Sequence, residues 1–464
     1  MRVNKWRVGL VVLIATVLLT CGTLRAQEDS YALKGTIVTP EQVLENGMIL
    51  IVGEKIKDVG PNISLPHGTL VVETDGVILP GFIDLHNHIT WNLFPRWRTY
   101  KEFANRYEWQ QIPGYGMALS TPHFELGKAK LGCDMNRYAE VKAIAEGETS
   151  LIGSLGADKC IEGMARNLDF YSGFYEPGIP GKEKLRNEVF PLELDNATVT
   201  QINSALDKQE LKAFIAHLSE GKPTDASAAR EIRMFAARGF LRSGVSIIHG
   251  VALKQADFQK LAANHVGLIW SPRSNIDLYG GTADVASALR ENVKMALAPD
   301  WSPTGSDGML EELAYATTWN QGQFPVVFSN KELVRMATQY PAQLAGLDDK
   351  IGVIAAGKYA DVIVLKRKEM DAYDAIVHAN PADVELVIID GRPVYGNPGV
   401  MKKILPHEKL ELVPVCGTEK AISFESEAKT QGVPPKTWAE TTRVLDSALR
   451  EWRSSLAPLA QCGN

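Results

Sequence analysis

The middle of the chain repeats one order of elements, and this repeat restricts the fold more than any other feature. Four apolar stretches have the length of buried strands, at 211–217, 245–249, 266–270 and 293–298. Each is followed by a stretch typical of a helix, at 225–238, 256–264, 283–291 and from Met309 onward. A repeated strand and helix predict a parallel sheet, and 464 residues are enough to close it. We therefore expect an α/β fold with a (β/α)8 barrel of the TIM type.

The two ends of the chain differ from this middle. Short strands separated by Gly, Pro and charged residues are expected at 32–38, 48–52, 69–77, 361–365, 384–388 and 392–395. Two β-rich flanks around a barrel predict one small β-sandwich domain assembled from both ends. The expected division is 1–26 as a signal peptide, 27–79 with 352–415 as the composite β-sandwich, 80–351 as the barrel and 416–464 as a C-terminal extension.

The first residues have the pattern of a secretory signal. Positive charges at positions 2, 5 and 7 precede an apolar stretch at 8–19, and Ala26 provides a small residue for cleavage before Gln27. The apolar stretch is short for a stable membrane span. We expect an exported protein, periplasmic or extracellular. A lipid anchor on Cys21 is the weaker alternative, because the residues before Cys21 fit a lipoprotein signal poorly.

Export affects the interpretation of the cysteines. Without Cys21, four remain: Cys133, Cys160, Cys416 and Cys462. Four cysteines in an oxidising compartment allow three disulfide connectivities. Cys416 and Cys462 bracket the C-terminal extension, so a bridge between them would hold the tail down. Cys133 and Cys160 form the remaining pair, for which buried free thiols are an equal alternative.

Composition and charge exclude one class of partner. The net charge is −6 and the chain has no evident basic patch, which argues against a nucleic-acid partner. Hydrophobic residues make up 45% and charged residues 22%, as in an ordinary soluble enzyme. We expect a small-molecule substrate. A homo-oligomer is left open.

An apolar run at 77–85 ends in two histidines one residue apart, His86 and His88. Residues i and i+2 of a strand point to the same face, so both imidazoles project side by side. Two neutral nitrogens directed at one point are half of a transition-metal site. The alternative is a pair of hydrogen-bonded surface histidines. With nine histidines in the chain and this pair closing a strand, we favour the metal site.

Other strand ends carry suitable side chains. His217 and Glu220 follow one strand, His249 closes the next and Asp300 closes another. In a barrel these ends meet on one face, where catalytic groups lie. Three histidines and one carboxylate suit a divalent metal, with Zn²⁺ the first choice and Fe²⁺ the second. Such a metal activates water, and Glu220 is placed to relay protons between that water and a leaving group.

A second, bridged metal is not expected. The fourth barrel strand, expected at 188–194, contains no lysine that could be modified to bridge two ions. Lys212 begins its strand, so it lies at the opposite end of the barrel.

The segment at 89–136 breaks the strand-and-helix order and is rich in aromatic residues, so we expect a long inserted loop. Trp91, Trp270 and Trp301 lie at or beyond strand ends. They either line a pocket for a flat ring or pack the insertion onto the barrel, and the sequence favours neither interpretation over the other. Arg273 and Asn275 either orient polar substrate atoms or cap a turn. We take Trp91, Arg273 and Asn275 as substrate-binding candidates.

These residues belong to motifs that resemble the amidohydrolase superfamily, in its cytosine deaminase and triazine hydrolase branch. The motifs are PGFIDLHNH at 80–88, HLSE at 217–220, IHG at 248–250, SPRSN at 271–275, PD at 299–300 and GVIAAGKYAD at 352–361. The resemblance implies that one divalent metal is held by His86, His88, His217 and Asp300. It further implies that Glu220 is the proton shuttle, that His249 bonds the attacking water or the substrate, and that Asp300 also accepts a proton. The family fold is a distorted barrel with a β-sandwich.

The chain departs from that branch at several points. It has Ala-Pro-Asp-Trp at 298–301 where branch members often have Gly-Thr-Asp, and the aromatic insertion replaces a short apolar turn after His88. Nucleobase deaminases of the family are mostly cytoplasmic, whereas this chain begins with an export signal. These departures leave the metal ligands in place and the substrate open.

The expected function is therefore metal-dependent hydrolysis of a non-peptide carbon–nitrogen bond, with deamination of a cyclic amidine first. Hydrolysis of a lactam or an acyl amide, as in imidazolonepropionase-like or aminoacylase-like enzymes, is the alternative within this class. The rival from another class is a non-catalytic binding protein on the same scaffold. The sequence names neither the substrate nor the native metal.

Overall fold

The computed structural model describes residues 30–153, 164–169, 184–425 and 436–462. Its barrel strands are β5 (Phe82–Asp84), β6 (Glu148–Leu151), β7 (Arg166–Asn167), β8 (Leu185–Glu188), β9 (Ala213–Leu218), β10 (Val245–His249), β11 (Gly267–Trp270) and β12 (Met295–Leu297). They form a three-stranded sheet, β5-β6-β7, and a five-stranded sheet, β8 to β12, and every pair is parallel. The expected TIM-type barrel is confirmed.

The barrel closes between its last and first strands, just beyond their ends. Asn87 forms a parallel bridge with Asp300. The backbone N–H of His88 donates to the Asp300 carbonyl at 3.2 Å, and that of Asp300 donates to the His86 carbonyl at 3.0 Å. Backbone pairing therefore brings the histidine pair and Asp300 together, although more than 200 residues separate them in sequence.

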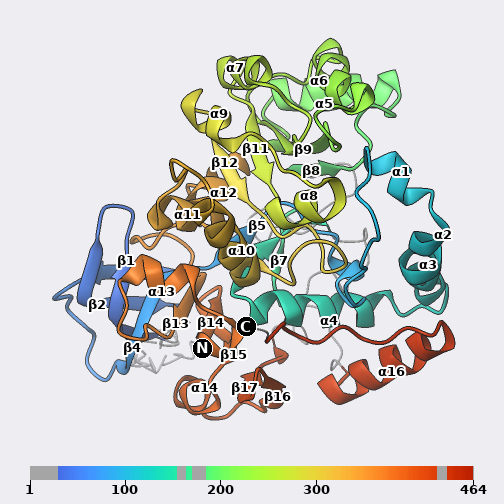
Figure 1. Cartoon of the computed structure of the whole chain (residues 1–464). Helices are drawn as coiled ribbons and strands as arrows, with labels where there is room; N and C mark the ends of the chain where they lie inside the picture. Colours follow the sequence, from blue (N-terminus) through green and yellow to red (C-terminus); the bar gives the residue numbers. More distant parts are fainter. Residues whose placement is uncertain (1–29, 154–163, 170–183, 426–435, 463–464) are drawn as a thin grey trace, which may run out of the picture.

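Alternating side chains divide the barrel strands between two cores, because successive residues of a strand face opposite sides. Ile215, Ile248 and Ile269 belong to an inner cluster, whereas Phe214, Ile247 and Leu268 pack against the helices. The helices are α5 (Asn196–Asp207), α6 (Ala226–Ala237), α7 (Gln255–Ala263), α8 (Pro272–Tyr279), α9 (Val285–Arg290), α10 (Met309–Gln321), α11 (Asn330–Ala337) and α12 (Gln339–Leu344). Figure 1 shows α5, α6, α7 and α9 outside β9 to β12.

The β-rich flanks form one continuous nine-stranded sheet (Figure 1). Its strands are β1 (Ser30–Val38), β2 (Val43–Val52), β3 (Lys55–Gly60), β4 (Leu70–Pro80), β13 (Val362–Leu365), β14 (Val384–Ile389), β15 (Arg392–Gly396), β16 (Glu411–Val415) and β17 (Thr418–Ile422). Antiparallel pairing of β4 with β13 joins the two ends of the chain. Val77 and Leu79 face the core shared with the barrel, whereas Ile78 faces the other side.

Several expected boundaries differ from the observed ones. The boundary between 415 and 416 falls inside the β16–β17 hairpin, so part of the expected extension belongs to the sheet. The fourth barrel strand is Leu185–Glu188 rather than 188–194, because a short strand with polar residues carries little apolar signal. Helix α8 was not expected, since its first residues, Pro-Arg-Ser-Asn, have the composition of a turn.

The aromatic insertion is helical, which corrects the expectation of a long loop. It contains η1 (Ile89–Trp91), α1 (Arg106–Gln110), α2 (Pro113–Tyr115), the π-helical turn η2 (Gly116–Ser120), α3 (Thr121–Lys128) and α4 (Gly132–Ala145). Most of these helices are too short to be stable alone. Apolar side chains of the insertion, among them Leu93, Phe103 and Trp109, form a core of their own with Trp301 from the barrel. This tertiary packing stabilises helices that local propensity does not predict.

The C-terminal extension is tied to the rest of the molecule. Cys416 and Cys462 form a disulfide, which is one of the pairings that the four cysteines allow. Helix α16 (Trp438–Glu451) lies along α4 (Figure 1), and Trp438 stacks on Tyr138 with 5.3 Å between ring centroids. Cys160 of the other expected pair lies outside the described residues. Among the described residues, no helix combines the length and apolar character needed to cross a membrane.

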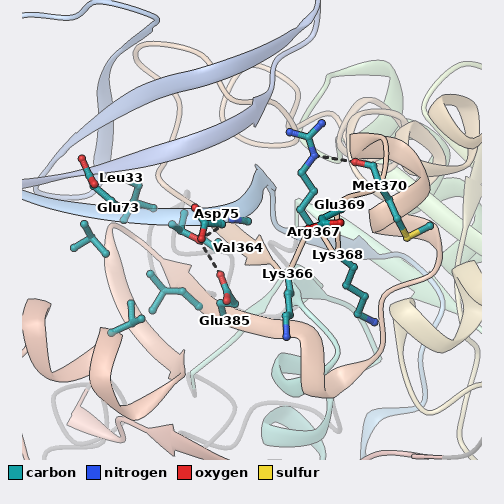
Figure 2. Close-up of a pocket in the computed structure, with 15 residues that line it drawn as sticks. Leu33, Glu73, Asp75, Val364, Lys366, Arg367, Lys368, Glu369, Met370 and Glu385 are labelled. Carbon is teal, nitrogen blue, oxygen red and sulfur yellow. Dashed lines mark hydrogen bonds between the residues drawn. The ribbon is translucent and has the colours of Figure 1, made fainter.

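A cavity of about 980 Å³ lies in the β-rich part, between β4, β13 and the turn at 366–370 (Figure 2). Its lining carries charges of both signs, including Asp75, Lys366 and Glu369. A hydrogen bond from Thr74 to Glu385 crosses it at 2.8 Å. None of its lining residues belongs to the histidine motifs, so the chemistry suggested by the sequence lies elsewhere.

Candidate metal centre and active site

The histidine pair follows β5 in a tightly held turn. The Asp84 carboxylate accepts hydrogen bonds from the His86 backbone N–H at 2.8 Å and from the Asn87 side-chain amide at 2.6 Å. The rings of His86 and His88 are 5.6 Å apart, so they project to the same side as the i, i+2 spacing predicts. Asp84 thus holds the turn that carries both imidazoles.

Three ends of barrel strands bring donor atoms to one point. His86 Nε2 lies 3.1 Å from His217 Nε2 and 3.1 Å from Asp300 Oδ1. His88 Nε2 is 3.5 Å from the same Asp300 oxygen. Within the described residues, two overlapping groups have ligand atoms within 4.8 Å of one another: His86, His88 and His217, and His86, His249 and Asp300. The structure therefore places these predicted residues together at the barrel mouth.

The chemistry of this donor set fits a divalent cation. Burial lowers the pKa of His86 to about 4, lowers that of His88 and brings that of His217 well below its usual range. These imidazoles are therefore neutral at pH 7 and can bind a metal through a lone pair. His217 Nδ1 is buried and has no hydrogen-bond partner among the described residues. An uncompensated cluster of lone pairs is costly when buried, and a bound cation would offset that cost.

Asp300 supplies the negative charge of the cluster. Burial opposes ionisation of this carboxylate, but the surrounding imidazoles of His86, His249 and His88 outweigh it and lower the pKa of Asp300. His86, His88, His217 and Asp300 are the residues that could hold one divalent metal.

Left-handed backbone conformations direct several of these side chains. His249 has φ 69°, Asp300 φ 70° and Ser219 φ 52°. Residues other than glycine rarely adopt such values, and they concentrate at functional sites. In each case the chain turns sharply just where a barrel strand ends. The site is therefore built partly from strained backbone that the surrounding packing maintains.

Glu220 and His249 lie beside the donor cluster. His249 Nε2 is 3.5 Å from Glu220 Oε2, and its ring is 4.6 Å from that of His86. His249 Nδ1 lies 2.8 Å from Asn275 Oδ1, an acceptor, which assigns the proton of a neutral imidazole to Nδ1. His249 Nε2 is then free to accept a hydrogen bond from a substrate or a water molecule.

The predicted substrate-binding residues lie in different surroundings. Trp91 stacks on His123 at 3.9 Å between ring centroids and forms part of the insertion's aromatic cluster. Arg273 pairs with Glu311 of α10. Asn275 uses its oxygen for His249 and its amide for Thr282 at 3.1 Å, so both of its polar groups are engaged within the protein.

The two other tryptophans differ from each other. Trp270 is fully buried among the outer helices, 5.1 Å from Trp319, and does not line the mouth. Trp301 lies close to the donor cluster, with its ring 5.8 Å from that of His88.

Sequence reasoning missed two residues that contact the site. Ser271 Oγ lies 2.7 Å from His86 Nδ1, and it could have been found because it directly follows β11. Tyr279 donates a hydrogen bond to Glu220 Oε1 at 2.5 Å. No local signal marks Tyr279, since it ends a helix that the sequence does not predict.

Comparisons with known proteins agree with this arrangement. Residues 197–394 match the amidohydrolase family. That segment includes His217, Glu220, His249 and Asp300, while the histidine pair precedes it. Over this segment the chain is similar to the amidohydrolase family. Strand β8 contains no lysine, so it offers no lysine that could be modified to bridge two ions.

Two relatives are similar over most of their length. The chain is 24% identical over 401 residues to the 5-methylthioadenosine/S-adenosylhomocysteine deaminase of Thermodesulfovibrio yellowstonii, covering 77% of this chain and 90% of that protein. Its structure is similar to that of an adenosine deaminase from Xanthomonas campestris with bound zinc, with a TM-score of 0.66, 16% identity and coverage of 91% and 98%.

A third protein is a triazine hydrolase, one of the two enzyme types that name the expected branch. The triazine hydrolase of Arthrobacter aurescens superimposes with a TM-score of 0.63 at 17% identity, covering 82% of this chain and 98% of that one. At such identities the two structural likenesses show the shared fold.

Proposed function

We propose that this protein is an amidohydrolase that deaminates a cyclic amidine in a metal-dependent hydrolysis, with Zn²⁺ as its ion. The observation that carries the proposal is the position of the Glu220 carboxylate. It lies beside His249 and next to a buried set of three imidazoles and one carboxylate. A donor set that holds a divalent ion, with a carboxylate adjacent to move protons, is the arrangement that hydrolysis of an sp² carbon–nitrogen bond requires.

The residues have distinct roles in this reaction. When bound, the divalent ion supplies Lewis-acid activation and makes hydroxide accessible near neutral pH. Glu220 takes up a proton and passes it to the ring nitrogen or the departing amine. His249 Nε2 accepts a hydrogen bond and orients the reacting group. Asp300, which is ionised, is a second acceptor for the proton of the attacking water.

The relatives support the substrate class. The matched proteins are named as deaminases of adenosine or of 5-methylthioadenosine and S-adenosylhomocysteine. The six-membered ring of adenine is a cyclic amidine whose amino group leaves as ammonia. The aromatic cluster at the mouth, with Trp91 and Trp301 5.6 Å apart, suits contact with a flat ring.

Ammonia release by zinc-loaded protein tests the proposal. Cyclic amidines are assayed for ammonia, whereas lactams and acylated amino acids, whose hydrolysis releases no ammonia, are assayed by chromatography of the cleavage products. Wild type should release ammonia from at least one amidine. Glu220→Gln should keep the zinc content and lower kcat by at least about 100-fold, since a positioned acid-base group contributes 10² to 10⁴. The matched control is Glu419→Gln, an exposed residue on β17.

Three outcomes contradict the proposal. Full turnover by Glu220→Gln removes this residue from the reaction. If the protein hydrolyses only the lactams or acyl amides, its substrate class is not the cyclic amidines. Protein that takes up neither Zn²⁺ nor Fe²⁺ and releases no ammonia is a binding protein on this scaffold.

We also propose that the protein is exported after removal of residues 1–26. The signal pattern of the first residues supports export. The Cys416–Cys462 disulfide supports it too, because structural disulfides persist mainly in oxidising compartments.

A further inference from the structure

The helical insertion contacts the loop that carries Glu220. The Arg106 backbone N–H donates to the Glu220 carbonyl at 3.2 Å, and Lys222 N–H donates to the Ala104 carbonyl at 2.8 Å. Asn105 and Gly221 form an antiparallel bridge between these contacts. A Cβ at Gly221 would lie 2.6 Å from the Ala104 carbonyl oxygen, so the two backbones approach as closely as glycine allows. The insertion is therefore part of the wall of the active site.

A chain of two hydrogen bonds leads from the insertion to the Glu220 carboxylate. Trp109 of α1 donates from its indole Nε1 to the Tyr279 hydroxyl oxygen at 2.9 Å. Tyr279 of α8 donates to Glu220 Oε1 at 2.5 Å. The three residues are 6%, 3% and 5% exposed, so water does not compete for these bonds.

The direction of both bonds follows from the chemistry of the groups. An indole N–H is only a donor, and an ionised carboxylate is only an acceptor. The Tyr279 oxygen accepts from Trp109, which leaves its own hydrogen for Glu220. Burial and the neighbouring Glu220 carboxylate raise the pKa of Tyr279 well above its usual range, so the hydroxyl stays protonated.

The consequence is that the two oxygens of Glu220 differ. Oε1 is occupied by the tyrosine hydroxyl. Oε2 is 3.5 Å from His249 Nε2 and 3.8 Å from the Arg106 guanidinium. A proton on Oε1 would break the bond from Tyr279, whereas a proton on Oε2 leaves it intact.

We propose that Trp109 and Tyr279 are positioning residues that hold Glu220 through Oε1, so that the proton of the reaction is carried on Oε2. This inference rests on the proposed deamination. The proton that reaches Oε2 from the attacking water leaves on the departing amine. Trp109 and Tyr279 neither lose nor gain a proton. The insertion thereby contributes to catalysis.

Removing the tyrosine hydroxyl tests the inference. Tyr279→Phe should lower kcat about 10- to 100-fold, the effect of deleting a hydrogen bond to a charged group. KM should stay within about twofold and the zinc content should not change, because the hydroxyl contacts neither the donor cluster nor, in this proposal, the ground-state substrate. Trp109→Phe should lower kcat less, since it removes the second bond of the chain.

Tyr340→Phe is the matched control. Tyr340 of α12 donates to Glu332 Oε1 at 3.0 Å, so this variant deletes the same kind of bond away from the site. It should keep the wild-type kcat. A Tyr279→Phe variant with kcat within twofold of wild type overturns the inference, as does a loss that appears only in KM.

A spectroscopic readout works without a substrate. In protein with ¹⁵N-labelled tryptophan, the Trp109 indole resonance is the one that is missing from the spectrum of the Trp109→Phe variant. Glu220→Gln removes the charge at the end of the chain and should move this resonance, whereas that of the remote Trp319 should stay. An unmoved Trp109 resonance overturns the inference. Wild type that releases no ammonia overturns the proposed function. In that case the response of the Trp109 resonance to Glu220→Gln still shows whether the hydrogen bonds connect Trp109 to Glu220.

Discussion

Glu312 of α10 illustrates how burial sets the protonation of one residue. It is fully buried, and its Oε1 accepts from the Arg273 backbone N–H at 3.3 Å while Oε2 accepts from the Ser306 hydroxyl. Burial raises the pKa of Glu312 to about 8. Between its ordinary pKa of 4.5 and 8, the folded state therefore binds more protons than the unfolded state. The contribution of Glu312 to stability is full below this window and is lost as pH rises through it.

Glu312→Gln should remove this pH dependence. The amide stays neutral and can still accept from Arg273, so the variant should gain stability relative to wild type as pH rises. The difference in the free energy of unfolding should grow by at most about 1.4 kcal/mol per pH unit. Urea unfolding at pH 5, 6, 7 and 8 measures it, with Glu419→Gln as the exposed control. Parallel stability curves for Glu312→Gln and wild type would contradict the prediction.

At the scale of elements, the C-terminal tail holds the insertion in place. The Ala457 backbone N–H donates to the Leu93 carbonyl at 2.8 Å, just after the histidine pair, and the Tyr138 hydroxyl donates to the Ala457 carbonyl. Lys436 forms an ion pair with Asp134 of α4 at 2.8 Å. The disulfide closes this segment, so α16 and the tail cannot separate far from the molecule.

Replacing both cysteines, Cys416→Ser with Cys462→Ser, should therefore loosen the tail. The two residues are 46 apart in sequence, and opening a loop of that length lowers the stability of the closed segment by at most about 4 kcal/mol. Faster proteolysis after residue 452 and a lower Tm are expected. Ser455→Ala, an exposed change in the same tail, is the control. Wild-type resistance to proteolysis in the double variant would show that α16 holds without the disulfide.

At the scale of the whole molecule, the proposed processing leaves the fold complete. The proposed mature chain begins at Gln27, and β1 begins at Ser30, so cleavage removes none of the described residues of the sheet. Expression of all 464 residues in a Gram-negative host should give periplasmic protein whose first residue, by N-terminal sequencing, is Gln27. A lipid-modified Cys21 at the N-terminus, or an intact Met1 in the cytoplasm, would contradict the prediction.

The residues of the donor cluster were accessible to sequence reasoning because their positions follow from local pattern. Each of His86, His88, His217, His249 and Asp300 lies at or just beyond the end of an apolar stretch. In a parallel barrel those ends meet on one face. Strand pattern and strand direction were therefore enough to bring them together, without knowledge of any side-chain contact.

Elements without such a pattern were missed or misplaced. Helices α1 to α3 are short, α2 and α3 contain Gly and Pro, and β8 is largely polar. Their stability comes from contacts with distant segments, as in the aromatic cluster around Trp109. The contacts of Asn275 and Arg273 likewise depend on α8, which no local pattern indicates.

The sequence by itself determined the barrel, the two-ended β-rich sheet and the donor set, because periodicity and strand ends are properties of neighbouring residues. Only the tertiary structure decided that Tyr279 meets Glu220 from 59 residues away, and that Trp109 reaches Tyr279 from 170 residues away. Such contacts depend on how helices pack against one another. Many other side chains have similar neighbours in the sequence but make no such contact. The sequence pattern therefore identified the residues of the donor cluster, and helix packing decided which side chains position Glu220.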